Sequence, residues 1–487
     1  MPETDLRKCD VGIAGLAGLG RSVARDISSH LYQVAAYDSQ PRDRANVVAA
    51  DPFVHAQTLA ELAGLLRQPR TIFIFCETEA QIDTVIGELL PHLSQQDLLI
   101  DGSNSYFKDT TRRARALSQR SIDFMGLGLW GIGPERRGTM IMAGGRREAH
   151  VRTRPLLEAL ASNTNGEPAV GYHDSPAAAH FVRMVHAGIE YALMQLVFET
   201  FDLMQRTLQL SDQDLHDVCA NWRIGVFNGH LREFSGNVFS PVFKRSEWRV
   251  LEEMLAAVRK DSIARWSRQS ARELGAPTPI IDAALESRHD LARERQLLLI
   301  STPFRHPSGK FGTQTEGVLD QLHKALYAAM IITYAEGLAL LAKGSRWHGF
   351  GLDIVEIVRL WKGGCTVRIS LLDDIIATLQ ATPALDNLLC DEDLSEKVWA
   401  NQESLRRAVW RANELGSVVP CLLSALDSLD CCRDAWLPVN LVQIPPRDHS
   451  TRTAKQTDDT PLTRLPLLDA QVNRLSGFPA EGRSSAP

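Results

Sequence analysis

The stretch that decides the fold is Val11-Gly-Ile-Ala-Gly15-Leu-Ala-Gly-Leu-Gly20. Its first four residues are apolar and predict a buried strand, and the string that follows has the G-x-A-x-x-G spacing of a dinucleotide-binding turn. In such a turn the first glycine permits a tight bend, the small second residue admits the pyrophosphate, and the last glycine lets a helix pack on the strand. A turn between strand and helix that holds no ligand is the alternative interpretation. We predict that a nicotinamide cofactor is bound by Gly15, Leu16, Ala17, Gly18, Leu19 and Gly20.

A second apolar run, Val34–Tyr37, ends in Asp38, which lies 23 residues beyond Gly15. An acidic residue at this place accepts hydrogen bonds from the ribose hydroxyls and repels a 2′-phosphate. NAD(H) is therefore favoured. NADP(H) stays open, because Arg42 and Arg44 are close enough in the chain to offer a phosphate site.

Short apolar runs alternate with amphipathic stretches over the first ~175 residues, a pattern typical of a parallel sheet with crossover helices. Thr71–Cys76 and Ile122–Met125 are two further runs that predict strands. Beyond that point only long helical periodicities are found, and after Pro445 the hydrophobic periodicity ends in a Pro-, Thr- and Ser-rich stretch. Inspection finds no internal repeat. We expect an α/β Rossmann domain over residues 1–176, a large all-α substrate and dimerisation domain over 177–440, and an extended C-terminal tail over 441–487.

Composition excludes several classes of function. The 53 basic and 59 acidic residues give a net charge of −6, which does not suit binding to nucleic acid or to an anionic membrane. The eight cysteines are scattered without metal-ligand spacing, so no metal site and no disulfide framework are expected. The N-terminus lacks the apolar segment of a signal peptide, and the apolar stretch 325–342 is expected to be a buried helix rather than a membrane span. A cytoplasmic protein is the expectation.

Several strings are similar to those of the 6-phosphogluconate dehydrogenase family. They are Asp101-Gly-Ser-Asn-Ser105, Asp109-Thr-Thr-Arg-Arg113, His180 to Tyr191, Lys324-Ala-Leu-Tyr327, Trp361-Lys-Gly-Gly-Cys365 and Arg447-Asp448. The resemblance runs from about Cys9 to Asp448. It implies a Rossmann domain, a helical domain and a tail that reaches the partner subunit of a homodimer.

The resemblance also assigns catalytic residues, and Arg183, His186 and Glu190 fall on one stripe of a predicted helix. A stripe of this kind is either a solvated face or the wall of a site. Glu190 matches the family's general acid, and Asn104 and His186 are also retained. Arg183 stands where the family has the lysine that takes the alcohol proton. Because guanidinium keeps its charge in proteins, Arg183 is expected to bind an anion or polarise a carbonyl, not to act as a base.

Two further substitutions change the expected substrate. The family's asparagine beside the histidine is Ala187, which removes one hydroxyl contact. In Leu129-Trp130-Gly131-Ile132 apolar bulk replaces the serine and glycines that receive the substrate carboxylate. Burying a carboxylate against Trp130 would cost several kcal/mol. We expect the carboxylate end of the site, lined by Trp130 and Gly131, to be closed.

The phosphate end is expected to be retained, since cations and hydroxyls suit a phosphate or phosphonate. The resemblance places its ligands at Tyr191, Lys260, Ser262 and Arg288, with Arg447 from the neighbouring subunit. Scattered surface charges are the alternative. The family's cofactor loops correspond to Asp38-Ser39-Gln40 and Cys76-Glu77-Thr78, together with Asn104. Here the arginine that holds a 2′-phosphate is missing, and Glu77 replaces a lysine.

The residues favour a reductase acting on a small keto-phosphonate or keto-phosphate without decarboxylation. Hydride reaches a ketone, Arg183 and Asn104 stabilise the alkoxide, and Glu190 or His186 supplies the proton. Within the family, the class that this predicted activity resembles is the 2-oxopropylphosphonate reductases of fosfomycin biosynthesis. Two hypotheses compete with this one. They are a decarboxylating 6-phosphogluconate dehydrogenase with an altered site, and a non-catalytic nucleotide-binding protein.

Overall fold

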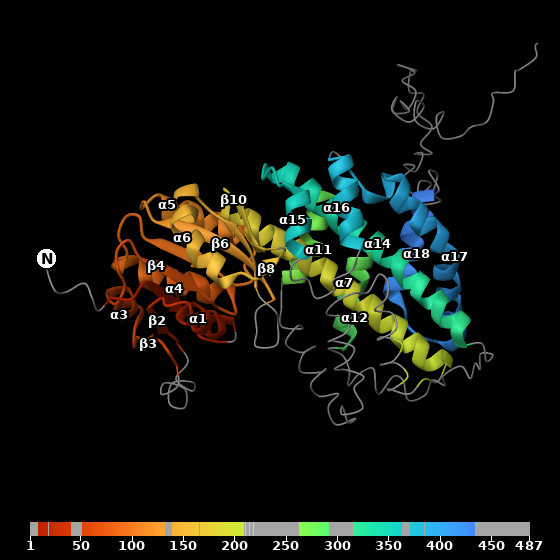
Figure 1. Cartoon of the computed structure of the whole chain (residues 1–487), viewed down its shortest axis with the longest axis horizontal. Coiled ribbons are helices and arrows are strands. Elements are labelled where there is room, and N and C mark those ends of the chain that lie inside the picture. Colours follow the sequence, from red (N-terminus) through yellow and green to blue (C-terminus); the bar gives the residue numbers. More distant parts are fainter. Residues whose placement is uncertain are drawn as a thin grey trace, which may run out of the picture. The chain divides into compact units, whose positions relative to one another are not determined.

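A computed structural model describes most of the first 433 residues (Figure 1). The predicted tail over 441–487 lies outside the described part. The described residues are 8–17, 19–39, 51–131, 139–164, 166–208, 210, 214, 218, 263–291, 315–362, 371–383 and 385–433.

The N-terminal half is built on an eight-stranded sheet in the order β10-β7-β6-β5-β4-β1-β2-β3. Every neighbouring pair is parallel except β6 with β7. The predicted α/β Rossmann architecture is therefore confirmed. The strands are β1 (Val11–Ala14), β2 (Val34–Tyr37), β3 (Val54–His55), β4 (Thr71–Ile74), β5 (Leu98–Asp101), β6 (Asp123–Trp130), β7 (Met140–Gly144) and β10 (Val170–His173).

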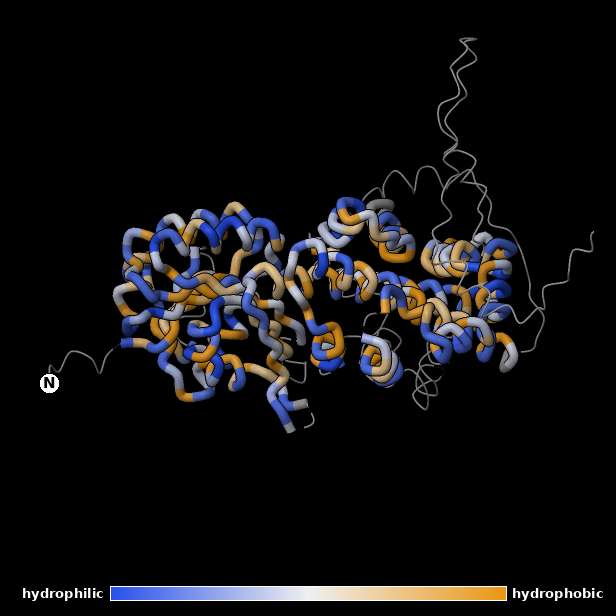
Figure 2. The backbone as a smooth tube through the Cα atoms, turned by 90° about the horizontal axis from the view of Figure 1, so that it is seen from above, coloured by the Kyte–Doolittle hydropathy of each residue, from blue (hydrophilic) through white to orange (hydrophobic). Residues whose placement is uncertain are grey.

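Helices cover both faces of this sheet, which is why its strands read as continuous apolar runs. In β4, for example, Phe73 packs into one buried cluster while Ile72 and Ile74 pack into the other. Figure 2 shows the hydrophobic strands enclosed by more hydrophilic helices. These helices are α1 (Leu19–Ser29), α3 (Leu59–Gly64), α4 (Glu79–Leu89), α5 (Phe107–Ser118) and α6 (Arg147–Leu160). The 3-10 turn η2 (Leu90–His92) follows α4, and a two-stranded ribbon, β8 (Asn163–Thr164) with β9 (Glu167–Pro168), precedes β10.

Two strand ends differ from the prediction. The strand predicted at Thr71–Cys76 ends at Ile74, where the chain turns toward the helix capped by Thr78. The strand predicted at Ile122–Met125 continues to Trp130, because its second half, from Gly126 onward, pairs with β7. As a result, Trp130 is held by a regular sheet rather than by a loop.

The second half is helical, as predicted. Its helices are α7 (Pro176–Leu208), α11 (Ile263–Leu274), α12 (Pro279–Leu291), α14 (Thr315–His348), α15 (Ile354–Lys362), α16 (Leu371–Ala381), α17 (Glu392–Leu415) and α18 (Pro420–Arg433), with the 3-10 turn η5 (Leu388–Cys390). The segment 317–348 is long and apolar enough to cross a membrane, but 83% of its most apolar window is buried within the protein. It is a core helix, as expected.

The helical part contains a repeat that inspection of the sequence does not reveal. The segment Glu273-Leu-Gly275-Ala-Pro-Thr-Pro279, before α12, corresponds to Glu414-Leu-Gly416-Ser-Val-Val-Pro420, before α18. In each segment the glycine has a positive φ, 61° and 65° respectively, which permits the helix to end there. A buried glutamate from another helix then accepts backbone hydrogen bonds at each new helix start. Glu336 of α14 accepts from Ile280 (3.0 Å), and Glu199 of α7 accepts from Leu422 (2.9 Å).

Candidate active site

At two glycines of the turn after β1 there is no room for a side chain. Gly15 has a φ of 100°, and a Cβ there would lie 1.9 Å from the carbonyl oxygen of Phe75. A Cβ on Gly20 would lie 2.0 Å from the carbonyl oxygen of Gly15. Leu16 is buried beneath the turn, and Leu19 begins α1. Backbone without side chains at a helix start fits a bound pyrophosphate. Of the residues predicted in this turn, only Gly18 lies outside the described part.

The other predicted cofactor residues lie at the same carboxyl edge of the sheet. Asp38 and Ser39 directly follow β2, and Cys76 and Glu77 follow β4, which pairs with β1 on the opposite side. Burial raises the pKa of the Cys76 thiol to about 12, with a further contribution from Asp101. The thiol is therefore protonated at neutral pH and does not act as a thiolate nucleophile.

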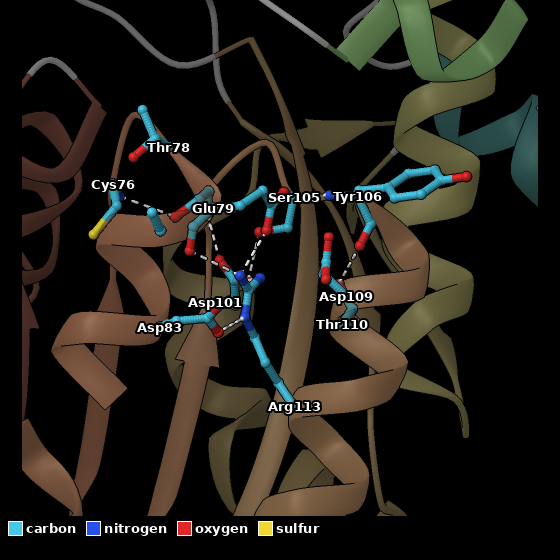
Figure 3. A network of polar contacts seen from close by, with 12 residues as sticks. Cys76, Thr78, Glu79, Asp83, Asp101, Ser105, Tyr106, Asp109, Thr110 and Arg113 are labelled. Atoms are coloured by element: carbon cyan, nitrogen blue, oxygen red, sulfur yellow. Dashed lines mark hydrogen bonds and ion pairs between the residues drawn. The ribbon is translucent and has the colours of Figure 1, made fainter. Parts of the chain in front are cut away.

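A buried arginine organises the loops at this edge (Figure 3). Arg113 of α5 is 2% exposed, and its guanidinium reaches Glu79 (2.7 Å) and Asp83 (2.8 Å) of α4. The carboxylate of Asp101, at the end of β5, lies 3.7 Å away and accepts a 2.6 Å hydrogen bond from Ser105. The network ties α4, β5 and α5 together around the loop that carries the predicted site residue Asn104. In the sequence, Arg113 and Asp101 stand out only as parts of strings similar to those of the family, and no role was predicted for either.

The predicted catalytic stripe lies on α7, facing the end of β6. The guanidinium carbon of Arg183 is 5.7 Å from the ring centroid of Trp130. Nε and Nη1 of Arg183 are buried, and neither has a hydrogen-bond partner in the part of the chain that the structure describes. A cation with two buried, unsatisfied donors is a favourable place for an anion or a carbonyl oxygen.

The histidine and glutamate of the stripe are also in contact. His186 is 1% exposed, and its Nδ1 lies 3.3 Å from Oε2 of Glu190. The indole N–H of Trp130 donates a 2.9 Å hydrogen bond to the same Nδ1. The sequence predicts apolar bulk at Trp130 but not this hydrogen bond, because the bond depends on the side-chain orientation at the end of β6.

The structure describes some of the predicted substrate residues and not others. Trp130 is buried, Gly131 follows it with a φ of 72°, and Tyr191 packs into the helical core. Asn104 is exposed, in the loop after β5. Lys260, Ser262 and Arg447 lie outside the described residues, and Arg288 lies in α12 with its side chain not described. The phosphate site therefore stays a prediction.

In chemical terms, the site contains the guanidinium of Arg183, the imidazole of His186 and the carboxyl group of Glu190. The guanidinium and the imidazole contact the indole of Trp130. The guanidinium can stabilise a developing oxyanion, and the carboxyl group can supply a proton. In the described part of the site, neither Arg183 nor Trp130 can remove a proton at neutral pH.

Comparisons with known proteins agree with the division into a dinucleotide-binding part and a helical part. The model for the NAD binding domain of 6-phosphogluconate dehydrogenase matches residues 10–171, and that for the C-terminal domain of the same enzyme matches residues 179–449. The NADP(+)-dependent, decarboxylating 6-phosphogluconate dehydrogenase of Bacillus subtilis is 33% identical over 459 residues, covering 93% of this chain and 98% of the relative. The decarboxylating enzyme of Synechocystis is 33% identical over 463 residues, covering 93% and 96%. The solved 6-phosphogluconate dehydrogenase of Plasmodium falciparum superposes with a TM-score of 0.81 at 26% identity, over 93% of this chain and 99% of that one.

Proposed function

The chain belongs to the 6-phosphogluconate dehydrogenase family. We propose that it reduces a small ketone bearing a phosphate or phosphonate, without decarboxylation. It is a nicotinamide-dependent dehydrogenase acting on a CH–OH or C=O group. The finer proposal concerns the substrate and the direction of hydride transfer. The compound 2-oxopropylphosphonate, reduced to 2-hydroxypropylphosphonate, is the example with which to test it.

The observation that carries the proposal is the pair of buried, unpartnered donors on Arg183, among the described residues, beside Trp130. Guanidinium cannot take the alcohol proton as the family's lysine does, so oxidation would need a different base. Reduction needs a donor for the developing alkoxide, which guanidinium does provide. The buried indole of Trp130 stands where the resemblance places the small residues that receive the substrate carboxylate. Both features support a substrate without a carboxylate beside the reacting carbon.

The remaining roles follow from this proposal. Nicotinamide supplies the hydride when the cofactor is bound on the turn from Gly15 to Gly20. Arg183 and Asn104 orient the carbonyl oxygen, Glu190 delivers the proton, and the phosphate group is held by Tyr191, Lys260, Ser262 and Arg288, with Arg447 from the second subunit of a homodimer. A cytoplasmic location and the domain limits at 176 and 440 belong to the same proposal.

The cofactor preference is a separate part of the proposal. Asp38 follows β2 as the acid that would disfavour a 2′-phosphate, which supports NAD(H). The Bacillus subtilis relative is named as NADP(+)-dependent, which supports NADP(H). Measuring kcat/KM with both cofactors decides this point. We expect NADH to be preferred, and we expect Asp38→Ala with Ser39→Arg to reverse the preference.

Oxidative decarboxylation of 6-phosphogluconate is the second candidate. It is favoured by the names of the relatives that are 33% identical over 93% of the chain. A non-catalytic nucleotide-binding protein is a third, weaker candidate. Retention of His186, Glu190 and Asn104 together speaks against it.

The deciding experiment gives the purified protein 2-oxopropylphosphonate with NADH or NADPH, and in parallel 6-phosphogluconate with NAD⁺ or NADP⁺. Turnover of the ketone alone supports the proposal. Oxidation of 6-phosphogluconate with release of CO₂ contradicts it and supports the second candidate. If the cofactor binds and neither substrate reacts, the 2-oxopropylphosphonate example fails. A panel of three- and four-carbon keto-phosphates then separates another ketone substrate from a non-catalytic protein.

A further inference from the structure

The hydrogen bond between Trp130 and His186 restricts where the imidazole can carry its proton. An indole nitrogen only donates, so the nitrogen that it contacts must present a lone pair. The contact is short, 2.9 Å between Nε1 of Trp130 and Nδ1 of His186, and both side chains are buried. In neutral His186 the proton must therefore be on Nε2.

Glu190 approaches the same nitrogen from its own position on α7. Its Oε2 lies 3.3 Å from Nδ1, a distance at which histidine and glutamate at i and i+4 usually form an ion pair through an N–H on Nδ1. That pair requires a proton where the indole hydrogen bond requires a lone pair. The two arrangements exclude each other.

We propose that Trp130 is a positioning residue: its indole N–H fixes His186 in the form with the proton on Nε2 and prevents a proton from being shared between His186 Nδ1 and Glu190. The inference has a consequence for the reaction, and this consequence rests on the proposed function: Glu190, not Nδ1 of His186, supplies the proton to the alkoxide. His186 acts through Nε2 as a hydrogen-bond donor.

The site contains its own control. The ring of Trp361, in α15, also packs edge-on against His186, with ring centroids 4.7 Å apart and an interplanar angle of 62°. Its buried Nε1, however, has no hydrogen-bond partner in the described part of the chain. Replacing either tryptophan with phenylalanine keeps an aromatic ring against His186, but only Trp130→Phe removes an N–H that bonds the imidazole.

The test is nitrogen NMR of the full-length protein labelled with ¹⁵N-histidine, without substrate, at an alkaline pH where the imidazoles are neutral. His186 is identified among the 14 histidines by the signal lost in His186→Asn. We expect a non-protonated Nδ1 and a protonated Nε2 in the wild-type protein and in Trp361→Phe. In Trp130→Phe we expect the proton to move to Nδ1, toward Glu190.

Kinetics with the reducible substrate provide a second measurement. Trp130→Phe should lower kcat roughly five- to tenfold, the effect of one neutral hydrogen bond, and should change KM much less. A protonated Nδ1 in the wild-type protein, or the same nitrogen pattern in Trp130→Phe as in the wild type, overturns the inference. The NMR result does not depend on turnover, so it can fail while the proposed function holds, and the reverse is also possible.

Discussion

The guanidinium of Arg183 lies over the indole ring of Trp130, 5.7 Å from its centroid. By the resemblance described above, the family has a lysine where this chain has Arg183. It has small residues where this chain has Trp130. Their contact shows that the two departures form one structural unit. A cation over an indole face is stabilised without neutralisation by a carboxylate, so the charge remains available to a ligand.

This arrangement predicts a trade-off between stability and activity at Arg183. Arg183→Met fills the same space without the buried donors, so it should stabilise the substrate-free protein by about 1 kcal/mol. It should lower kcat/KM roughly 10²- to 10³-fold, as expected for the loss of an oxyanion donor. Arg206→Met, at an exposed position of α7 paired with Asp202, is the control and should change neither value much. Urea unfolding and steady-state kinetics provide both measurements. A destabilised Arg183→Met would contradict the prediction.

The network around Arg113 predicts a contrast between neighbouring arginines. Arg113→Ala leaves the carboxylates of Glu79 and Asp101 without their buried cation, which should cost about 3–5 kcal/mol of unfolding free energy. Arg112 is exposed and pairs with Asp83 and Asp109, so Arg112→Ala should cost less than ~1 kcal/mol. Denaturant unfolding monitored by circular dichroism compares the two. Equal losses would mean that burial of the Arg113 network does not matter.

The turn after β1 predicts a strong effect of a single methyl group. Gly15→Ala places Cβ against the Phe75 carbonyl and strains a positive φ, so it should greatly weaken cofactor binding and lower the melting temperature. Gly87→Ala, in α4, meets no atom within 4 Å and should stabilise the protein by about 0.5–1 kcal/mol. Cofactor titration by fluorescence and thermal melts test both variants. Normal cofactor affinity in Gly15→Ala would contradict the assignment of this turn.

Burial of Glu336 predicts a dependence of stability on pH. Burial raises its pKa from 4.5 to about 8, so between these values the carboxyl group is protonated when folded and ionised when unfolded. Unfolding then releases a proton, and stability should fall as the pH rises from about 4.5 to 8. Glu336→Gln should reduce this slope and be more stable than the wild type above pH 8. Thermal melts across this range test it, with the exposed Glu403→Gln as the control. Identical slopes in the wild type and Glu336→Gln would contradict the prediction.

Much of the fold could be predicted because its determinants are local. The run Val11–Ala14 and the turn after it carry their own strand and turn signals, and α7 carries an unbroken helical pattern. The end of β6 could not be placed, because its extension to Trp130 depends on pairing with β7. The repeat within the helical part was missed for a different reason: it consists of only a few residues before two helix starts.

The candidate site was predicted in its composition but not in its contacts. The stripe of Arg183, His186 and Glu190 follows from helical spacing, whereas the bond from Trp130 joins residues 56 positions apart in the sequence. The role of Arg113 was missed because one arginine among many in a string gives no sign of burial. The phosphate residues Lys260, Ser262 and Arg447 lie outside the described part of the structure and stay predictions.

The hydrogen bonds from the start of α18 to Glu199 have a consequence for synthesis on the ribosome. Glu199 and Cys421 are 222 residues apart, and chains are made at roughly 5–20 residues per second, so α7 emerges about 10 to 45 seconds before its partner. During that time α7, which carries Arg183, His186 and Glu190, has been made, but Glu199 lacks the hydrogen bonds that the start of α18 will donate. Helix α7 can therefore reach its final packing only when the last described helix of the chain has left the ribosome. A protein truncated before α18 would never form these hydrogen bonds to Glu199, and cellular quality control would recognise it as incompletely folded.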